Sequence, residues 1–316
     1  MKIKREKNRY TSKADIALIC VLGIVLLLYT LSILCVLGWG FLTSLKSRLD
    51  FFVEKNVLGL PDLTLSGAEL RFGNYLKIIK AFEFDKSTIF YSAGKYTEHY
   101  AHADIFLMMY NTFLYAIAGS LLQAIVPAVC AYLCAKFNFA FSKFAYTLVL
   151  FVMIIPIVGA YPAEITLLRD LGLYDTFLGY FLQKFNFTGM YFFVYYAFYQ
   201  TMPDTYAEAA EIDGANRYQI LGSIVLPLSV KLISTVWLLQ FVHFWNDYQT
   251  SLLYMPTKPT LAYGIYYLCH ETARGQLANV PAKVAGCMML AVPLICLFIA
   301  FKEKLMGNIS MGGIKE

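Results

Sequence analysis

Few residues of this chain have the type and spacing that chemistry requires. His243 and Asp247 lie four positions apart, so both would project from one face of a helix, where they could bind a metal ion or relay a proton. Two ligands without a third make a poor metal site, and an interfacial pair at the end of an apolar helix is the better interpretation. Cys130 and Cys134 have the same spacing and the same shortage of partners, which favours packing. We expect no metal site.

The motifs of common enzymes are missing from the sequence. No Ser-His-Asp or Cys-His set, no HExxH and no phosphate-binding glycine loop occurs among the 316 residues. A membrane enzyme would need such a cluster. We therefore expect no catalytic residue, no metal and no bound nucleotide in this chain.

Long uncharged runs dominate the sequence, of which 59% is apolar and only 15% charged. A helix needs roughly 20 largely apolar residues to cross a hydrocarbon core of about 30 Å. The uncharged runs are residues 16–45, 105–135, 144–163, 185–203 and 284–301. A sixth apolar run, 224–248, carries charge at Lys231 and Asp247, which lie about 24 Å apart along a helix and can each reach one membrane face.

These runs predict an all-α polytopic membrane protein with six transmembrane helices. They are too long and alternate too little for the strands of a barrel, and unpaired backbone is not tolerated in lipid. The predicted spans are residues 16–42, 106–135, 144–163, 183–202, 224–248 and 283–301.

The basic N-terminal segment "MKIKREKNRYTSK" sets the orientation. Positive charge favours the cytoplasmic side, so both termini would be cytoplasmic, the N-in/C-in arrangement. The following apolar run is too long for a signal peptide and reads as a retained first helix. The chain then divides into a basic tail with the first helix (1–45), an extracytoplasmic loop (46–104), a transmembrane core (105–301) and a cytoplasmic tail (302–316).

One segment, "EAAEIDGANRYQILGSIVLPL" (208–228), is polar although apolar runs flank it. Pro203-Asp204-Thr205 is typical of a helix start, and the residues to Asp213 favour helix. Gly214 lies where a left-handed residue would end that helix, and a second helix would begin near Asn216. Topology places the segment in the cytoplasm, as two short helices joined rigidly to two spans. Ala209 and Ala210 would permit close approach by another protein, and Glu208 offers it a charge.

The spacing of Glu208, Ala209, Ala210, Gly214 and Pro227 resembles the EAA loop of binding-protein-dependent ABC importer permeases. Other segments resemble the carbohydrate branch of that family, in particular the second permease of maltose-type transporters. They are "FWNDY" (244–248, with Trp245, Asn246 and Asp247), "PTLAYG" (259–264, with Pro259, Thr260 and Gly264), "LGLYDT" (171–176), "FGNY" (72–75) and the tail "GNISMGGIKE" (307–316).

The resemblance implies the type I importer, MetI-like permease fold. It also implies that the pore, the ATPase and the solute-binding protein are separate subunits. A second, different permease would complete the pore, and two ATPases, which bind ATP and Mg, would dock on the EAA loop, 203–227. Within that loop the residues expected to couple are Glu208, Ala209, Ala210, Asp213, Gly214 and Pro227. Tail residues Gly307, Gly312, Gly313 and Lys315 would reach the ATPases. Pro259, Thr260 and Gly264 would face an extracytoplasmic solute-binding protein in a bacterial or archaeal cell membrane.

The solute expected from the resemblance is a sugar or oligosaccharide, and the lack of charge in the middle of the spans fits a neutral solute. Trp245, Asn246 and Asp247 are the expected polar residues of the pore or bundle, with Asn246 forming hydrogen bonds between helices. The aromatic run 190–200 could stack on sugar rings, although packing explains it better. Two alternatives remain: an amino-acid or peptide permease of the same superfamily, and an ion-coupled carrier, which would need buried charges and repeated halves.

Overall fold

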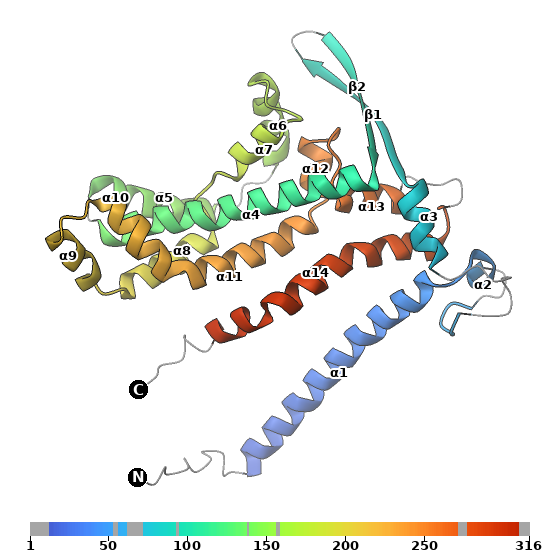
Figure 1. The fold of residues 1–316 in the computed structure, drawn as a ribbon, viewed down its shortest axis with the longest axis horizontal. Coiled ribbons are helices and arrows are strands. Elements are labelled where there is room, and N and C mark those ends of the chain that lie inside the picture. Colours follow the sequence, from blue (N-terminus) through green and yellow to red (C-terminus); the bar gives the residue numbers. More distant parts are fainter. Residues whose placement is uncertain are drawn as a thin grey trace. The chain divides into compact units, whose positions relative to one another are not determined.

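The computed structural model describes residues 13–52, 56–61, 72–92, 95–137, 139–155, 159–270 and 277–309 (Figure 1). Its elements, in chain order, are α1 (Lys13–Ser44), α2 (Arg48–Phe52), α3 (Gly73–Ala81), β1 (Glu83–Ser92), β2 (Lys95–Asp104), α4 (Ile105–Lys136), α5 (Ala140–Ile154), α6 (Ala160–Asp170), α7 (Phe177–Lys184), α8 (Met190–Thr201), α9 (Thr205–Ile212), α10 (Arg217–Ile220), the π-helical turn η1 (Leu221–Val225), α11 (Leu226–Trp245), α12 (Gln249–Tyr254), α13 (Leu261–His270) and α14 (Val280–Ile309).

Four of the helices in the described part of the chain are long and apolar enough to cross a membrane. They comprise residues Ala14–Ser44, Ile105–Lys136, Arg217–Trp245 and Val280–Phe301. The first is apolar around its whole circumference, and its side chains are largely exposed within the chain, as expected of a helix that contacts lipid. These four agree with four of the six predicted spans.

The other two predicted spans are not continuous helices. In 144–163, α5 ends at Ile154 and α6 begins only after Gly159, whose φ of +79° is left-handed and stops a right-handed helix. In 183–202, α7 ends at Lys184 and α8 starts after Gly189, with φ of +147°. The absence of charge predicted the apolar segments correctly. It does not reveal where the backbone interrupts a helix within such a segment.

The chain forms two compact units, of which the first comprises residues 1–78 and 274–288. In this unit, side chains of the segment "FGNY" (72–75) hold the C-terminal end of α1. The amide of Asn74 donates to the carbonyls of Ser44 (2.8 Å) and Lys46 (2.9 Å), and Tyr75 and Ser44 share a hydroxyl hydrogen bond of 2.7 Å. These bonds satisfy carbonyls that a helix end leaves without partners.

The second unit comprises residues 79–273 and 289–316, and α4 is its central helix. Both α8 and α11 pack along α4 (Figure 1). Three buried alanines on α4, Ala124, Ala128 and Ala131, leave room for large side chains of its neighbours. The aromatic rings of Phe192, Tyr195 and Tyr199 of α8 fill this space and are fully buried. The aromatic run 190–200 therefore contributes three rings to packing, which is the interpretation that the sequence favoured.

A two-stranded antiparallel sheet precedes α4 within the stretch that the sequence indicated as a loop. β1 pairs with β2 in the register Glu83↔Asp104, Asp85↔His102. One face of the hairpin packs on α13, because Phe84 is fully buried and its ring contacts those of Tyr263 and Tyr267. The loop 46–104 therefore contains a folded hairpin and the short helices α2 and α3.

Candidate functional site

The short helix α9 lies in the polar segment that the sequence singled out. It begins after Asp204 and ends in a Schellman motif, in which Ala215 N–H donates to Ala210 O (2.9 Å) and Gly214 N–H to Glu211 O (3.1 Å). Gly214 has φ of +84°, the left-handed geometry predicted for it. The local prediction of a helix that stops at Gly214 is confirmed.

The residues of α9 are divided between an anchored face and a free face. Ala210 is buried, whereas Glu208, Ala209 and Asp213 are exposed. Ile212 and Tyr218, which the sequence analysis did not single out, are both 86% exposed. Together, Glu208, Ala209, Ile212, Asp213 and Tyr218 form what we call the α9 surface. In a polar segment, the exposed side chains of Ile212 and Tyr218 provide apolar surface that a partner protein could cover.

Two contacts attach this region to the C-terminal end of α4. The ammonium of Lys136 donates to Asp204 Oδ1 (2.7 Å) and to the carbonyl of Met202 (2.5 Å). The guanidinium of Arg217 lies over the ring of Phe137, 5.1 Å from its centre. A cavity of about 180 Å³ lies between these contacts. α9 is therefore held at both ends against α4.

The next helix begins with a capping box. Gln219 N–H donates to Asn216 Oδ1 (2.9 Å), and Asn216 N–H donates to Gln219 Oε1 (2.8 Å). The start near Asn216 was predicted, but the helix is not short. It continues through η1 into α11, so residues 217–245 form one helix that is interrupted by a π turn.

Pro227 gives a physical reason for the π turn. It has no N–H to donate to the carbonyl four residues earlier, and its ring would clash with that carbonyl. The backbone N–H of Leu226 accordingly donates to Leu221 O, five residues back. Pro227 is exposed and marks a local change of helical geometry between α9 and the apolar part of α11.

At the other end of α11 the three residues of "WND" have different roles. Trp245 is fully buried and its indole N–H donates to Leu290 O of α14 (3.0 Å). Asp247 Oδ2 accepts from the hydroxyl of Tyr115 on α4 (2.5 Å). Asn246 is exposed and donates to Val242 O of its own helix (2.9 Å), so the expectation that it joins two helices is wrong. A residue that ends a helix finds its nearest acceptor in the last turn.

Pro259, Thr260 and Gly264 lie in the interior of their unit. The carbonyl of Pro259 accepts from Asn111 (3.1 Å), and Thr112 Oγ1 accepts from Leu261 N–H (2.7 Å). A Cβ at Gly264 would come within 2.3 Å of Met108 Sδ. These residues therefore attach α13 to α4 from the inside. A contact between their loop and a binding protein stays a prediction, and it would have to use neighbouring exposed residues.

Of the four tail residues, Gly307 lies in α14, and Gly312, Gly313 and Lys315 lie outside the described residues. Contact of this tail with another subunit remains a prediction.

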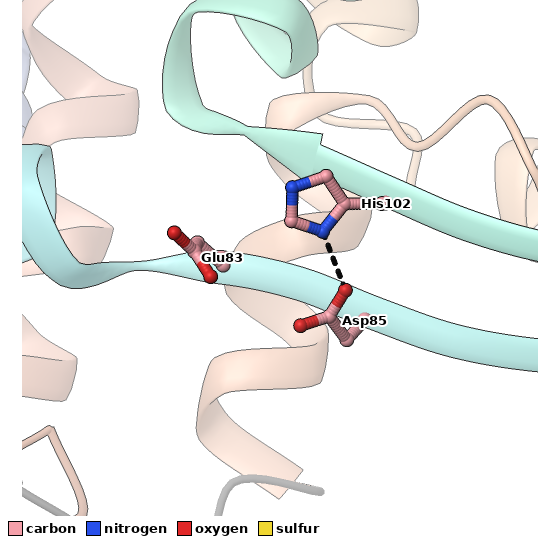
Figure 2. A group of neighbouring side chains, drawn as sticks. All are labelled: Glu83, Asp85 and His102. Atoms are coloured by element: carbon pink, nitrogen blue, oxygen red, sulfur yellow. Dashed lines mark hydrogen bonds and ion pairs between the residues drawn. The ribbon is translucent and has the colours of Figure 1, made fainter.

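A group of three potential metal ligands lies on the hairpin. Figure 2 shows Glu83 and Asp85 of β1 near His102 of β2, and the ligand atoms of the three side chains lie within 4.8 Å of one another. His102 Nδ1 donates to Asp85 Oδ1 (2.6 Å), and this hydrogen bond together with the charge of Asp85 raises the pKa of His102. All three residues are exposed, and such exposed acidic groups are common without an ion. The predicted pair of His243 and Asp247 gains no third ligand among the described residues.

Comparison with known proteins identifies the family. A model of the family "binding-protein-dependent transport system inner membrane component" matches residues 127–302, which include α9, α11 and most of α14. The chain belongs to this family. It is therefore the permease subunit of an ABC importer, a multi-pass membrane component that transports and is not an enzyme. The family name also implies that a binding protein takes part.

Relatives within this permease family match most of the chain. The melibiose/raffinose/stachyose import permease protein MelC of Bacillus subtilis (strain 168) is 26% identical over 228 residues, 71% of this chain and 81% of MelC. The maltodextrin transport system permease protein MdxG of the same organism is 27% identical over 269 residues, 82% of this chain and 91% of MdxG.

A solved structure supports the permease fold. One chain of a bacterial ABC transporter involved in the import of the acidic polysaccharide alginate superposes with a TM-score of 0.69 at 21% identity. The match covers 94% of this permease and 99% of the solved chain. The importer permease fold expected from the sequence is therefore confirmed.

Proposed function

We propose that this permease forms half of the pore of an ATP-driven importer for a sugar or oligosaccharide and that an ATPase docks on the α9 surface. The observation that carries the proposal is the construction of that surface. Exposed side chains lie on a helix that is attached to α4 through Lys136 and is followed by the single helix 217–245. A displacement of α9 by a bound ATPase would therefore be transmitted to α4 and to the helix 217–245.

The proposal includes a topology of six spans with both termini in the cytoplasm. α5 with α6, and α7 with α8, would be the third and fourth crossings, each made of two shorter helices. Broken helices are acceptable at membrane depth where their free backbone groups are buried in protein or line a polar cavity. The division into 1–45, 46–104, 105–301 and 302–316 belongs to the same proposal.

The sugar specificity is supported by the names of the relatives. MelC is a permease for melibiose, raffinose and stachyose, and MdxG one for maltodextrin. The partners would be a second, different permease, two ATPase subunits that bind ATP and Mg, and a solute-binding protein. The chain itself would hold no cofactor, and its location would be a bacterial or archaeal cell membrane.

The test uses Glu208→Lys, because this carboxylate is exposed on the α9 surface and its side chain forms no hydrogen bond or ion pair with the described residues that the change would break. The matched control is Asp170→Lys, at an exposed carboxylate at the end of α6. Both variants are expressed in the native host in place of the normal chain, and the tagged chain is purified from its membranes.

Glu208→Lys should reduce the recovered ATPase and the uptake of sugar at least tenfold, with normal amounts of the permease in the membrane. Asp170→Lys should change neither. If the Glu208→Lys permease retains both its ATPase and its uptake, the α9 surface is not the docking site.

A further inference from the structure

A polar cavity of about 420 Å³ lies among α4, α6, α7, the end of α11 and α12. It falls in the range of about 300–1,000 Å³ that small-molecule sites occupy. Its polar lining includes Gln123, Glu164, Lys184, His243, Asp247 and Tyr254. These residues come from five elements of one unit of the chain.

Two carboxylates in the lining are held in fixed positions. Glu164 Oε2 accepts from Gln183 Nε2 (2.9 Å) and from the hydroxyl of Tyr254. Burial, together with this bond, raises the pKa of Tyr254, so its hydroxyl remains a donor. Asp247 accepts from Tyr115 Oη (2.5 Å) and from Thr250 N–H (3.0 Å). Such anchoring leaves each carboxylate with free lone pairs and little freedom to move.

In the lining, one polar atom lacks a hydrogen-bond partner and one ammonium lacks an ion pair among the described residues. Gln183 Oε1 is buried and has no hydrogen-bond partner in the described part of the chain. The ammonium of Lys184 lies over the rings of Tyr180 (5.5 Å) and Phe244 (5.2 Å), and among the described residues no carboxylate is within 4.0 Å of it. Buried polar atoms without partners are rare in native proteins and call for a ligand or ordered water.

The chemistry of the lining selects among solutes. A ligand here meets fixed acceptors at Glu164 and Asp247 and a donor at Lys184. A hydroxyl group is both donor and acceptor, so several hydroxyls on one ring can satisfy all three side chains. The two carboxylates would repel an anion, and the ammonium would offset part of their attraction for a cation. Tyr161 and Tyr254, with ring centres 6.4 Å apart, add aromatic surface for the apolar face of a ring.

We propose that this cavity binds one ring of a neutral, hydroxyl-rich solute during its passage. The inference rests on the proposed function for the solute class, and it adds that this permease itself holds the solute. It also revises the sequence argument for a neutral solute. Charged side chains of both signs are present at the site, at the ends of the uncharged runs, and the hydroxyl groups of a neutral solute can bond to both.

The experiment uses the complete transporter in membranes of the native host. Uptake is measured for labelled raffinose and maltotriose, and diazirine derivatives of both sugars are photolysed during uptake. Attachment sites are then mapped by mass spectrometry. The variants are Glu164→Gln and Lys184→Met, with Asp170→Asn as the control, because Asp170 also lies on α6 but does not line the cavity.

For the transported sugar, label should appear in the segments 161–164, 183–186 and 247–254. Glu164→Gln should lower that labelling and the maximal uptake about tenfold, as expected for loss of a charged hydrogen-bond acceptor, and should change the preference between the two sugars. A variant that merely folds poorly would reduce both sugars alike and would lower the amount of permease in the membrane.

Two results would overturn the inference and leave the proposed function intact. In the first, sugar is taken up but the label appears only outside these segments. In the second, Glu164→Gln and Lys184→Met show the same labelling and the same uptake as the normal transporter. Absence of uptake of any neutral sugar by the normal transporter, with uptake of amino acids or peptides instead, contradicts the proposed solute class and the cavity assignment together.

Discussion

The ammonium of Lys136 lies 2.7 Å from the carboxylate of Asp204, so this ion pair joins the last turn of α4 to the N-cap residue of α9. The two residues are 68 positions apart in the sequence. Lys136 also donates to the carbonyl of Met202, just before α9. These two bonds therefore attach the start of α9 to the end of α4.

Lys136→Met should loosen this connection. The ion pair itself contributes little, about 0–1 kcal/mol, because Asp204 is largely exposed, so the protein should still fold. The loss of two bonds at the start of α9 should nevertheless lower sugar uptake several-fold while the ATPase still co-purifies. Lys136→Arg should restore part of the uptake. Lys143→Met, at an exposed lysine of α5, is the control. Unchanged uptake in Lys136→Met would show that the connection is not used in transport.

Gly214→Ala should destabilise the end of α9. An alanine has space there, since nothing lies within 4 Å of the added Cβ, but a φ of +84° costs a non-glycine residue about 1–2 kcal/mol. Hydrogen exchange of residues 205–216 should become faster by about tenfold. Gly222→Ala is a matched control, because its Cβ also meets nothing and its backbone is helical. Equal exchange in both variants would argue against strain at Gly214.

Tyr115→Phe should destabilise the unit around α4. It removes the hydroxyl that donates to Asp247 and leaves that carboxylate short of a partner, at a cost of about 1–3 kcal/mol. The measurement is thermal unfolding of the purified permease in detergent. Tyr110→Phe, on an exposed part of the same helix, should leave the midpoint unchanged. A Tyr115→Phe midpoint equal to that of the normal chain would contradict the assigned hydrogen bond.

The hairpin should be more stable in acid than in base. Asp85 raises the pKa of His102 above its unfolded value, so the stabilisation is fully present below about pH 6.5 and is lost as the pH rises through the folded pKa. Amide exchange of β1 and β2, corrected for the intrinsic effect of pH, should show this loss. His102→Gln should abolish the dependence and His99→Gln should keep it. A dependence of the opposite sign would exclude the His102–Asp85 interaction as its cause.

How far the sequence predicts the structure differs between elements. The limits of α9 follow from local chemistry, because Gly214 and Asn216 act on backbone groups within a few residues of them. The break between α7 and α8 was missed because charge counting does not detect a glycine with unusual φ. The hairpin was missed because one of its faces is exposed and polar, so its strands resemble a loop in composition.

Most of the contacts that the sequence did not predict join residues that are far apart in the chain. Asp247 and Tyr115 are 132 positions apart, and nothing local to either residue indicates the other. The same holds for Lys136 with Asp204. The cavity near Glu164 joins five elements, so its polar lining becomes visible only after folding. Ile212 and Tyr218 could have been noticed, since large apolar residues in a polar segment need a reason to be there.

The central claim is that the α9 surface receives the ATPase, and site-specific photo-crosslinking tests it most directly. Ile212, 86% exposed, is replaced by p-benzoylphenylalanine in the native host, and Ile89 of the hairpin, 65% exposed, serves as the reference position. After irradiation, Ile212→p-benzoylphenylalanine should form a covalent product with the ATPase subunit, and the reference position should form none. The account is contradicted if the position in α9 yields no ATPase product while the assembled transporter remains active.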